Sequence, residues 1–593
     1  MTDYTWDGGG DGTSWNDADN WGGSDYPRTN NDKATINTGS ASISMDISGG
    51  SGVVGEVSLG SSFTGTVTQA YGFTIDNAGS ENGALEINNV NATWNCNGSA
   101  LTVDSHISGN GTLTVGTSTV TCTGQTTVGI FNITTGTYNY FDDFRPTTTN
   151  ITDNATINQT STGGQLGGRI IITASKTPTF NAIGRFHSSF RIDSGEQGNS
   201  TINLDLSEPQ TSGGPARDLY FYNLEIDSQG TENNTYTLQG GLYCTGTLTI
   251  TDGIIDTKSG VSHAIQVTKH LDIGAGGTLT GRGSSISTGT MTIRDGGTLA
   301  NSGTITVTGE DVANSPSGAN WLWRQLEDDG TGFAPTAGTV HFNHASNLNG
   351  KHLNESKFYN LTLTAGTGHD VAWTPKTANT LTVSGDLTIV EGQLKRNVEA
   401  DTLVVTEDVS IESGGVLGDN DETGPNTFGS LTIASGGTYK ATSGTTTITS
   451  ENGTKCFDNQ SGGTFTHNNG TLKFASSIGD TTFDNAGADD FYNLTCETNG
   501  DCAYLNAITV LNNLTINNSN ANFKANTDAS GAITVHGITK LVDGIAFSTS
   551  DDNANADHYG FIVIEGGTFR ISDTSSATKT CDGIRNIGGT LSG

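Results

Sequence analysis

Proline, charged residues and large apolar residues are scarce in this sequence. Of its 593 residues only 9 are Pro, 15% are charged and 32% are hydrophobic. Ordinary globular domains carry more of the residues that form a core, so a thick hydrophobic core is excluded. Apolar residues at helical spacing are almost absent, and no apolar stretch approaches the length of a membrane span. We therefore expect neither a helical protein nor insertion in a membrane.

Basic residues are also few. The chain has 26 Lys and Arg against 61 Asp and Glu, a formal net charge of −35. Such a surface repels phosphate backbones, so the sequence predicts no binding to nucleic acid. The acidic coat is interpreted as a device for solubility. Calcium binding by GDNDETG, residues 418–424, is the alternative, although the segment lacks the full ligand spacing.

Motifs for metal or catalytic chemistry are missing as well. The seven cysteines show neither paired metal spacing nor a disulfide framework, so we expect small buried hydrophobes; a Cys496–Cys502 disulfide is the alternative. There is no phosphate loop, nucleophile elbow or HExxH. We predict no cofactor, no metal site and no enzyme activity. Acidic doublets flank predicted turns, where Asp is favoured by local hydrogen bonding: Asp142–Asp143, Asp328–Asp329, Asp489–Asp490 and Asp551–Asp552.

What the chain has in abundance is Gly, with 82 residues, and short runs such as GTLTV and GSLTI. Apolar and small polar residues alternate in these runs, which is typical of strands bounded by turns. Leu387, Val409 and Leu431 occupy equivalent places in three such runs and are 22 residues apart at each step. This period predicts an all-β fold, a parallel β-solenoid with coils of about 20–23 residues.

A hexapeptide recurs over a longer interval. FYNLEI begins at Phe221, FYNLTL at Phe358 and FYNLTC at Phe491, 137 and 133 residues apart. We interpret each as one core strand of a duplicated unit, with Phe358, Asn360 and Thr362 facing outward. The predicted inward residues of the three hexads are Tyr222, Leu224 and Ile226; Tyr359, Leu361 and Leu363; and Tyr492, Leu494 and Cys496.

The hexads suggest how the chain is divided. We predict a cap at 1–40, an irregular solenoid at 41–217, and three repeat units at 218–350, 351–484 and 485–593. Within 138–217, Arg145, Arg169, Arg185, Arg191 and Arg217 accompany Phe186, His187 and Phe190. These residues are expected to form a loop packed on the solenoid, with a docking surface as the alternative. An inserted loop is predicted at 311–337, where Trp321, Trp323 and Phe333 form a candidate binding loop.

Three tryptophans, Trp6, Trp15 and Trp21, lie near the start in WDGGG and WNDADNW. This segment resembles the module that opens many bacterial and phage β-solenoid proteins, which often also carry FYNLTI hexads. We expect the three rings to cap the first coil, with a carbohydrate-binding platform as the alternative.

The resemblance implies a non-enzymatic structural component of a phage virion, such as a fibre, spike or head decoration. The start of the chain has no basic or apolar leader region, so we expect a protein made in the host cytoplasm, located in the virion and extracellular after release. The alternatives are a bacterial adhesin or surface-layer-like protein, and a polysaccharide-degrading tailspike. The implied partners are other virion proteins and a host-surface glycan.

The sequence ends in DGIRNIGGTLSG, which has the pattern of another coil. An uncovered coil exposes an apolar cross-section and unpaired backbone groups. We therefore expect the coils from Phe561 onward to be covered by another subunit. By analogy with phage spikes, a homotrimer is favoured.

Overall fold

The computed structural model describes most of the chain. The described residues are 1–47, 52–76, 84–161, 164–183, 185–187, 190–192, 200–205, 218–227, 235–309, 321–326, 332–344, 348–375, 379–475, 477–518, 522–525, 531–544, 557–570 and 578–592. They form an all-β parallel solenoid of about 21 turns with almost no helix, which confirms the predicted fold class.

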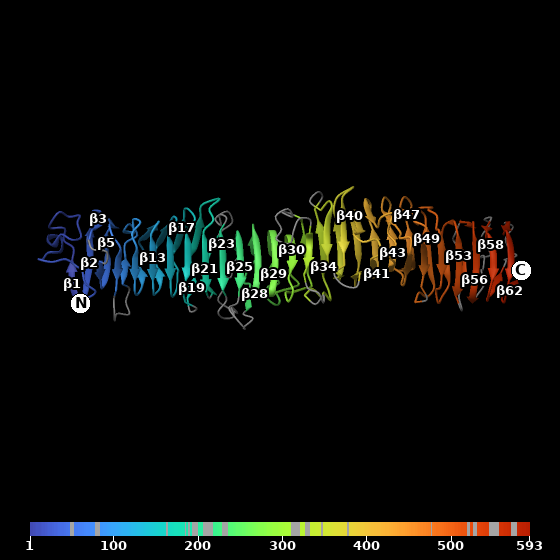
Figure 1. Ribbon diagram of the computed structural model, residues 1–593, viewed down its shortest axis with the longest axis horizontal. Coiled ribbons are helices and arrows are strands. Elements are labelled where there is room, and N and C mark those ends of the chain that lie inside the picture. Colours follow the sequence, from blue (N-terminus) through green and yellow to red (C-terminus); the bar gives the residue numbers. More distant parts are fainter. Residues whose placement is uncertain are drawn as a thin grey trace. The chain divides into compact units, whose positions relative to one another are not determined.

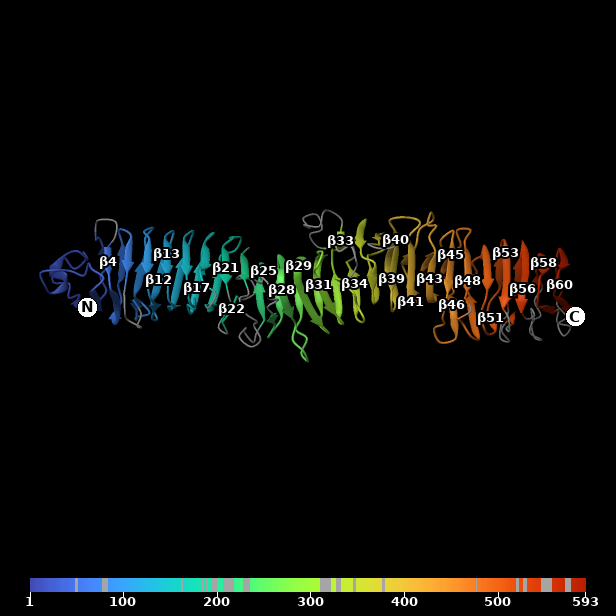
Figure 2. The same cartoon turned by 60° about the horizontal axis from the view of Figure 1, so that its bottom comes forward.

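Contacts divide the solenoid into two units. Unit 1 comprises Met1–Ser285 and Gly296–Leu299, and unit 2 comprises Ile286–Asp295 and Ala300–Gly593, so that β31 (Thr298–Asn301) carries the boundary. Within each unit the strands lie side by side and the colour changes steadily from one coil to the next (Figures 1 and 2). Consecutive coils are therefore spatial neighbours, as expected of a solenoid.

Unit 1 is built from three columns of parallel strands. The first column contains β1 (Thr2–Thr5), β2 (Asp32–Gly39), β5 (Glu56–Phe63), β8 (Leu85–Ile87), β11 (Ile107–Ser108) and β14 (Thr126–Thr127), and farther along β19 (Gln165–Leu166) and β22 (Arg185–Phe186) pair with each other. The second contains β3 (Ile43–Met45), β6 (Thr66–Gln69), β9 (Thr93–Asn95), β12 (Thr112–Gly116), β15 (Ile130–Ile133), β17 (Thr148–Ile151) and β20 (Arg169–Ile172).

The third column of unit 1 is the longest. It contains β4 (Gly52–Val54), β7 (Phe73–Ile75), β10 (Leu101–Val103), β13 (Thr119–Cys122), β16 (Thr137–Tyr140), β18 (Thr156–Gln159), β21 (Thr179–Ile183), β23 (Thr201–Asp205), β25 (Asn223–Asp227), β28 (Thr247–Asp256) and β29 (Ile265–Arg282). β24 (Leu219–Phe221), β26 (Thr235–Thr237) and β27 (Leu242–Cys244) pair beside it.

Unit 2 also has three columns, and its long strands turn a corner and join two of them. Column 1 contains β30 (Ile286–Ile293), β33 (Trp321–Gln325), β35 (Lys351–Asn354), β38 (Asp370–Thr374), β40 (Leu387–Arg396), β42 (Gly415–Leu417), β44 (Thr438–Lys440) and β47 (Thr464–Thr466).

Column 2 passes through β32 (Thr304–Val307), β34 (Thr339–Asn343), β37 (Asn360–Thr364), β40, β41 (Thr402–Ile411), β43 (Asn426–Ile433), β46 (Lys455–Asn459), β49 (Thr481–Asn485), β51 (Cys502–Tyr504) and β54 (Phe523–Ala525).

Column 3 passes through β36 (Lys357–Phe358), β39 (Thr380–Val383), β41, β43, β45 (Thr445–Ile448), β48 (Thr471–Phe474), β50 (Asn493–Cys496), β53 (Asn513–Asn518), β56 (Ile538–Gly544), β58 (Phe561–Ile564) and β61 (Gly583–Asn586).

The last coils of unit 2 add two short ladders. One contains β52 (Ile508–Val510), β55 (Ile533–Val535), β57 (Asp557–His558) and β60 (Lys579–Thr580), and the other pairs β59 (Thr568–Arg570) with β62 (Thr590–Ser592).

Coil length follows directly from the register. Leu387 pairs with Val409 and Val409 with Leu431, which confirms the predicted 22-residue step. The step is not uniform, because Val120 pairs with Tyr138 after 18 residues and Leu361 with Leu387 after 26. Turns of different length are tolerated because each strand needs only to reach its ladder partners.

The core is a stack of single side-chain layers. In unit 1, residues at one inward position pair in register from coil to coil and all are buried: Leu101, Val120, Tyr138, Ile157, Phe180, Ile202, Leu224, Leu248 and Leu271. On the outward side, the Asn158 amide donates to Asn139 at 3.1 Å and the Asn181 amide to Asn158 at 2.7 Å. The low apolar content is thus sufficient, because each coil buries only a narrow row.

The N-terminal segment packs as a small aromatic cluster. Trp6, Trp15 and Trp21 are buried, and the Trp21 ring lies 5.0 Å from Trp6 and 4.7 Å from Trp15. The 3-10 helix η1 (Ala18–Trp21) places Trp21, and Trp15 continues onto Phe73 of β7 at 6.4 Å. With Trp15 fully buried, the three rings offer no open carbohydrate platform.

Candidate functional site

The hexads form corners of the solenoid, and part of the predicted face assignment is wrong. Leu224, Ile226, Leu361, Leu363, Leu494 and Cys496 are buried as predicted. The tyrosines Tyr222, Tyr359 and Tyr492 are only half-buried, whereas the phenylalanines Phe221, Phe358 and Phe491 are buried. The chain bends at each Tyr, so the alternation of faces restarts there and Phe belongs to the preceding strand or bridge.

The bend explains why this sequence recurs. The Tyr359 carbonyl accepts a hydrogen bond from Gly385 N at 2.8 Å, and Asn360 Oδ1 accepts one from Asp386 N at 2.9 Å. The other two hexads repeat both contacts: Gly246 N to Tyr222 O and Thr247 N to Asn223 Oδ1, then Asn512 N to Tyr492 O and Asn513 N to Asn493 Oδ1. Each hexad therefore fixes the next coil at a corner.

The second and third hexads lie at different corners. Leu361 belongs to column 2, whereas Leu494 pairs with Leu472 in column 3, the column that also contains Phe358. Their spacing is thus not a whole number of coils. The motif marks a type of corner and does not mark one fixed position on the coil.

The candidate binding loop is largely interior. Trp323 lies in β33, is fully buried, and packs on Phe333 at 4.9 Å and Phe358 at 5.7 Å; Phe333 is 2% exposed. The prediction that these two residues serve binding is wrong, because a parallel strand carries them into the core. Trp321 is half-buried and faces outward, with its ring 5.3 Å from that of His352. Residues 310–320 and 327–331 lie outside the described residues.

The basic and aromatic segment of unit 1 is packed in the same way. Phe186 and Phe190 are buried and stack at 4.2 Å, next to Phe221. Arg145 forms an ion pair with Asp143 at 2.9 Å and a 3.2 Å hydrogen bond with His187. This arrangement favours a packed segment over a docking surface. Arg217 and the side chain of Arg185 lie outside the described residues.

Six of the seven cysteines are buried as predicted, whereas Cys581 is exposed, so the prediction is wrong there. Cys496 and Cys502 are free and buried, so the alternative of a disulfide between them is wrong. Asp143 accepts from Gln165 N at 2.8 Å, and Asp489 accepts from Phe465 N at 2.6 Å. Both are contacts between coils. The doublets at 328–329 and 551–552 lie outside the described residues.

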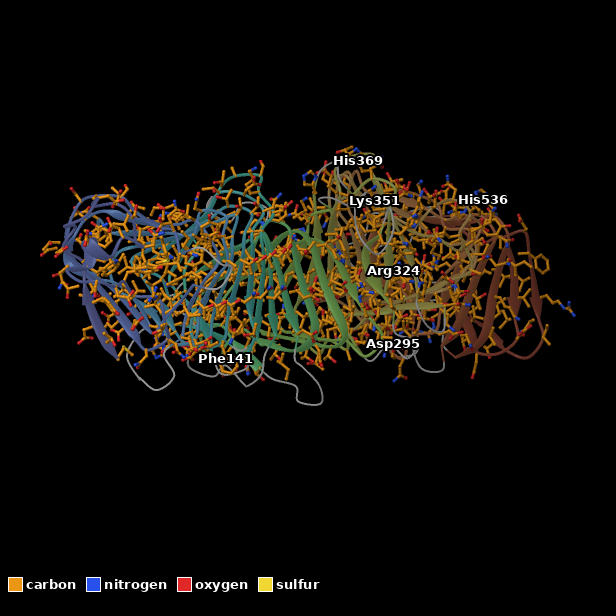
Figure 3. All side chains as sticks on the ribbon, turned by 60° about the vertical axis from the view of Figure 1, so that its left-hand side comes forward. Phe141, Asp295, Arg324, Lys351, His369 and His536 are labelled. Atoms are coloured by element: carbon orange, nitrogen blue, oxygen red, sulfur yellow. The ribbon has the colours of Figure 1, made fainter. Side chains whose placement is uncertain are left out.

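A groove in unit 2 is the strongest candidate for a site, and sequence reasoning missed most of it. It is a cavity of about 380 Å³ over β35, β38 and β40, with further walls from Asn397, Glu399, Asp419, Asp421 and Glu422. Figure 3 labels Lys351, which precedes His352 in β35, and His369, which precedes Asp370 of the neighbouring strand β38. The sequence signal that points to it is the acidic segment 418–424, for which calcium binding is the alternative interpretation.

Register explains the floor of the groove. His352 pairs with Ala372 and Ala372 with Lys395, on the side of each strand opposite the buried Leu353, Trp373 and Leu394. His352 and Lys395 are half-buried, and Ala372 between them is 6% exposed. Ala372 therefore lies between the longer side chains of His352 and Lys395. Because its side chain is short, a notch remains between them. Trp321, the register partner of His352, continues the same row.

The charged walls are linked by ion pairs. Lys395 Nζ lies 2.7 Å from Asp370 and 3.8 Å from Asp419, and Lys440 Nζ lies 3.5 Å from Asp419. Burial opposes the ionisation of Asp370, but the hydrogen bond and charge of Lys395 outweigh it and lower the pKa of Asp370. The hydrogen bond from Lys395 to Asp370 in turn raises the pKa of Lys395. Both groups are charged at neutral pH.

A buried arginine supports one wall of the groove. Arg396 pairs with Glu422, lies 5.4 Å from the Trp373 ring centroid, and donates to Asp401 O and Gly424 O. Burial raises the pKa of Glu422, although the Arg396 charge opposes this shift. These contacts occupy Arg396 fully, so its role is to hold residues 401–424 against β40.

The described residues were compared with the features that metal binding and membrane insertion require. Within the described ranges, no three His, Cys, Asp or Glu side chains are grouped so that they could hold a metal ion. The same part of the chain contains no helix with the length and hydropathy needed to cross a membrane. Comparisons with family models, curated proteins and solved structures gave no match to this chain.

Proposed function

We propose that the chain is a non-enzymatic structural component of a phage virion, such as a fibre, spike or head decoration, that contacts the host surface. The observation that supports this best is the continuous link between coils. Besides the backbone ladders, side chains join successive coils, as Lys455 does with Asp484 at 2.8 Å and Lys473 with Glu497 at 2.7 Å. A scaffold held in this way suits mechanical support better than movement.

Association with further copies is part of the proposal. By analogy with phage spikes and fibres, copies of the chain associate as a homotrimer or within a larger particle. Light scattering of the purified chain tests this; a monodisperse monomer at all concentrations would contradict it.

Mass spectrometry of purified virus particles tests the main proposal. We expect peptides of this chain in the particle at many copies, retained after washing at high salt. Recovery from cell envelopes alone would replace the proposal by the adhesin or surface-layer alternative. Release of reducing ends from a host polysaccharide would replace it by the depolymerising tailspike.

A further inference from the structure

We propose that the groove over β35, β38 and β40 binds a short saccharide that is neutral or carries an amino group. The inference deepens the proposed contact with a host surface and rests on it for the biological setting. The site itself is argued from the groove alone. Its lining includes His352, Ala372 and Lys395 along the floor and Asp370, Glu399, Asp419 and Asp421 at the sides. Trp321, the register partner of His352, continues the row of the floor beyond this lining.

The length of the groove floor suits an elongated ligand. Trp321, His352, Ala372 and Lys395 occupy one outward position on four successive strands. Neighbouring strands lie about 4.8 Å apart, so this row spans roughly 14 Å. The notch at Ala372 lies in the middle of the row. A ligand of a few linked rings fits this length better than a single compact ion.

The walls favour hydroxyl groups. Asp370, Asp419 and Asp421 offer carboxylate oxygens, which only accept hydrogen bonds, whereas the Lys395 ammonium only donates. Each carboxylate has about four lone-pair sites, so an ion pair leaves capacity for a ligand. A hydroxyl both donates and accepts, so a ligand rich in hydroxyl groups matches both kinds of partner.

The rings of His352 and Trp321 also suit a saccharide. Burial lowers the pKa of His352, so its imidazole is neutral at pH 7 and both donates and accepts. The half-buried Trp321 ring lies 5.3 Å from the His352 ring at the end of the row. An indole has a broad apolar surface that packs against the apolar face of a sugar ring.

The charge of the lining selects among saccharides. Arg396 and Glu422 neutralise each other within the wall. The remaining lining carries Asp370, Glu399, Asp419 and Asp421 against Lys395, and Lys440, from outside the lining, pairs with Asp419. The groove is therefore negative, and it disfavours uronic, sialic or sulfated sugars. Neutral and amino sugars face no such repulsion.

A glycan array followed by titration calorimetry tests the site on the full-length chain. The array carries neutral, amino-substituted, uronic and sialic oligosaccharides, and the strongest ligand is then titrated. We expect a neutral or amino oligosaccharide to bind. Ala372→Leu, which fills the notch, should weaken binding at least tenfold, and Lys395→Met should weaken it without changing the melting temperature appreciably.

Thr447→Leu is the matched control, because Thr447 is half-buried and outward-facing on β45 of the same unit. It should bind as the unchanged protein does. No bound sugar on the array, preference for acidic sugars, or unchanged affinity of Ala372→Leu would each overturn the inference. A calcium chloride titration that gives heat while all sugars give none would replace the saccharide by a cation.

Different experimental results would contradict the proposed function and the inference about the groove. A virion protein that binds no sugar contradicts only the inference about the groove. A protein that binds a sugar through Ala372 and Lys395 but occurs only in cell envelopes contradicts only the proposed function.

Discussion

The first and last described coils of this protein differ in what covers them. At the start, Trp15 is fully buried and Trp21 is 4% exposed beneath the packed N-terminal segment. Near the other end, Ile562 and Phe569 are each 2% exposed, whereas their register partners one coil later, Ile584 and Leu591, are 41% and 45% exposed. A solenoid coil contributes one layer, so an inward side chain is buried only when something packs over that layer.

The largest effect is expected from a charge placed in a coil that has neighbours on both sides. Leu361 is 1% exposed and lies in register between Val340 and Leu387. Leu361→Asp should remove the protein from the soluble fraction, because an unpaired charge in a dry interior costs several kcal/mol. Expression and fractionation measure this.

Thr362→Asp is the control for that variant. Thr362 is the adjacent, half-buried residue of β37 and faces outward. It should leave the protein soluble. Equal solubility of the two variants would contradict the assignment of faces.

A buried aromatic residue of the first coils should be more sensitive to substitution than an exposed apolar residue of the last described coil. Trp15→Ala removes the contacts with Trp21 and Phe73 and the 3.0 Å hydrogen bond to Pro27 O. We expect a loss of about 3–5 kcal/mol in the local stability of the first coils. Leu591→Ala, on the exposed coil, should change stability by less than about 0.5 kcal/mol. Hydrogen exchange of β1–β3 and of β61–β62 measures both; a larger effect at Leu591 would reverse the comparison.

The buried carboxyl group of Glu355 makes the stability of an interior coil depend on pH. Burial raises the pKa of Glu355 to about 8, against hydrogen bonds from Ser356 N and Lys357 N that lower it. Between its ordinary 4.5 and about 8, the folded protein holds a proton that the unfolded chain releases. The contribution of Glu355 to the free energy of unfolding should therefore be most favourable below pH 4.5 and fall as the pH rises toward 8.

Glu355→Gln should flatten this dependence in urea unfolding between pH 5 and pH 8. The comparison is between the two pH slopes, so a constant loss of stability in the variant does not affect it. Parallel slopes would show that Glu355 is ionised in the folded protein.

The smallest effect is expected at a corner, where only one contact between coils is lost. Asn360→Ala removes the acceptor of the Asp386 amide and should cost about 1 kcal/mol. Asn360→Asp keeps an acceptor oxygen and should be milder. Thermal unfolding of the two variants measures the difference, and a greater loss in Asn360→Asp would show that repulsion from Asp386 outweighs the hydrogen bond.

Alternation predicted the interior correctly wherever a strand runs straight. Leu361, Leu363, Leu494 and Cys496 are buried as the period of two requires. It failed at Tyr359, because a bend resets the alternation and the bend has no signature in polarity. The loop prediction failed at Trp323, since the short aromatic run WLW between Gly-containing segments is as typical of a loop anchor as of a core strand.

The sequence alone determined the all-β solenoid, the 22-residue step from Leu387 to Leu431 and the aromatic character of the first segment, because these are local and periodic properties. Only the tertiary structure decided the groove. His352, Ala372 and Lys395 are 20 and 23 residues apart and carry no shared motif. Loops of unequal length separate them, so the ladder register, which is a property of stacked coils, brings them into one row.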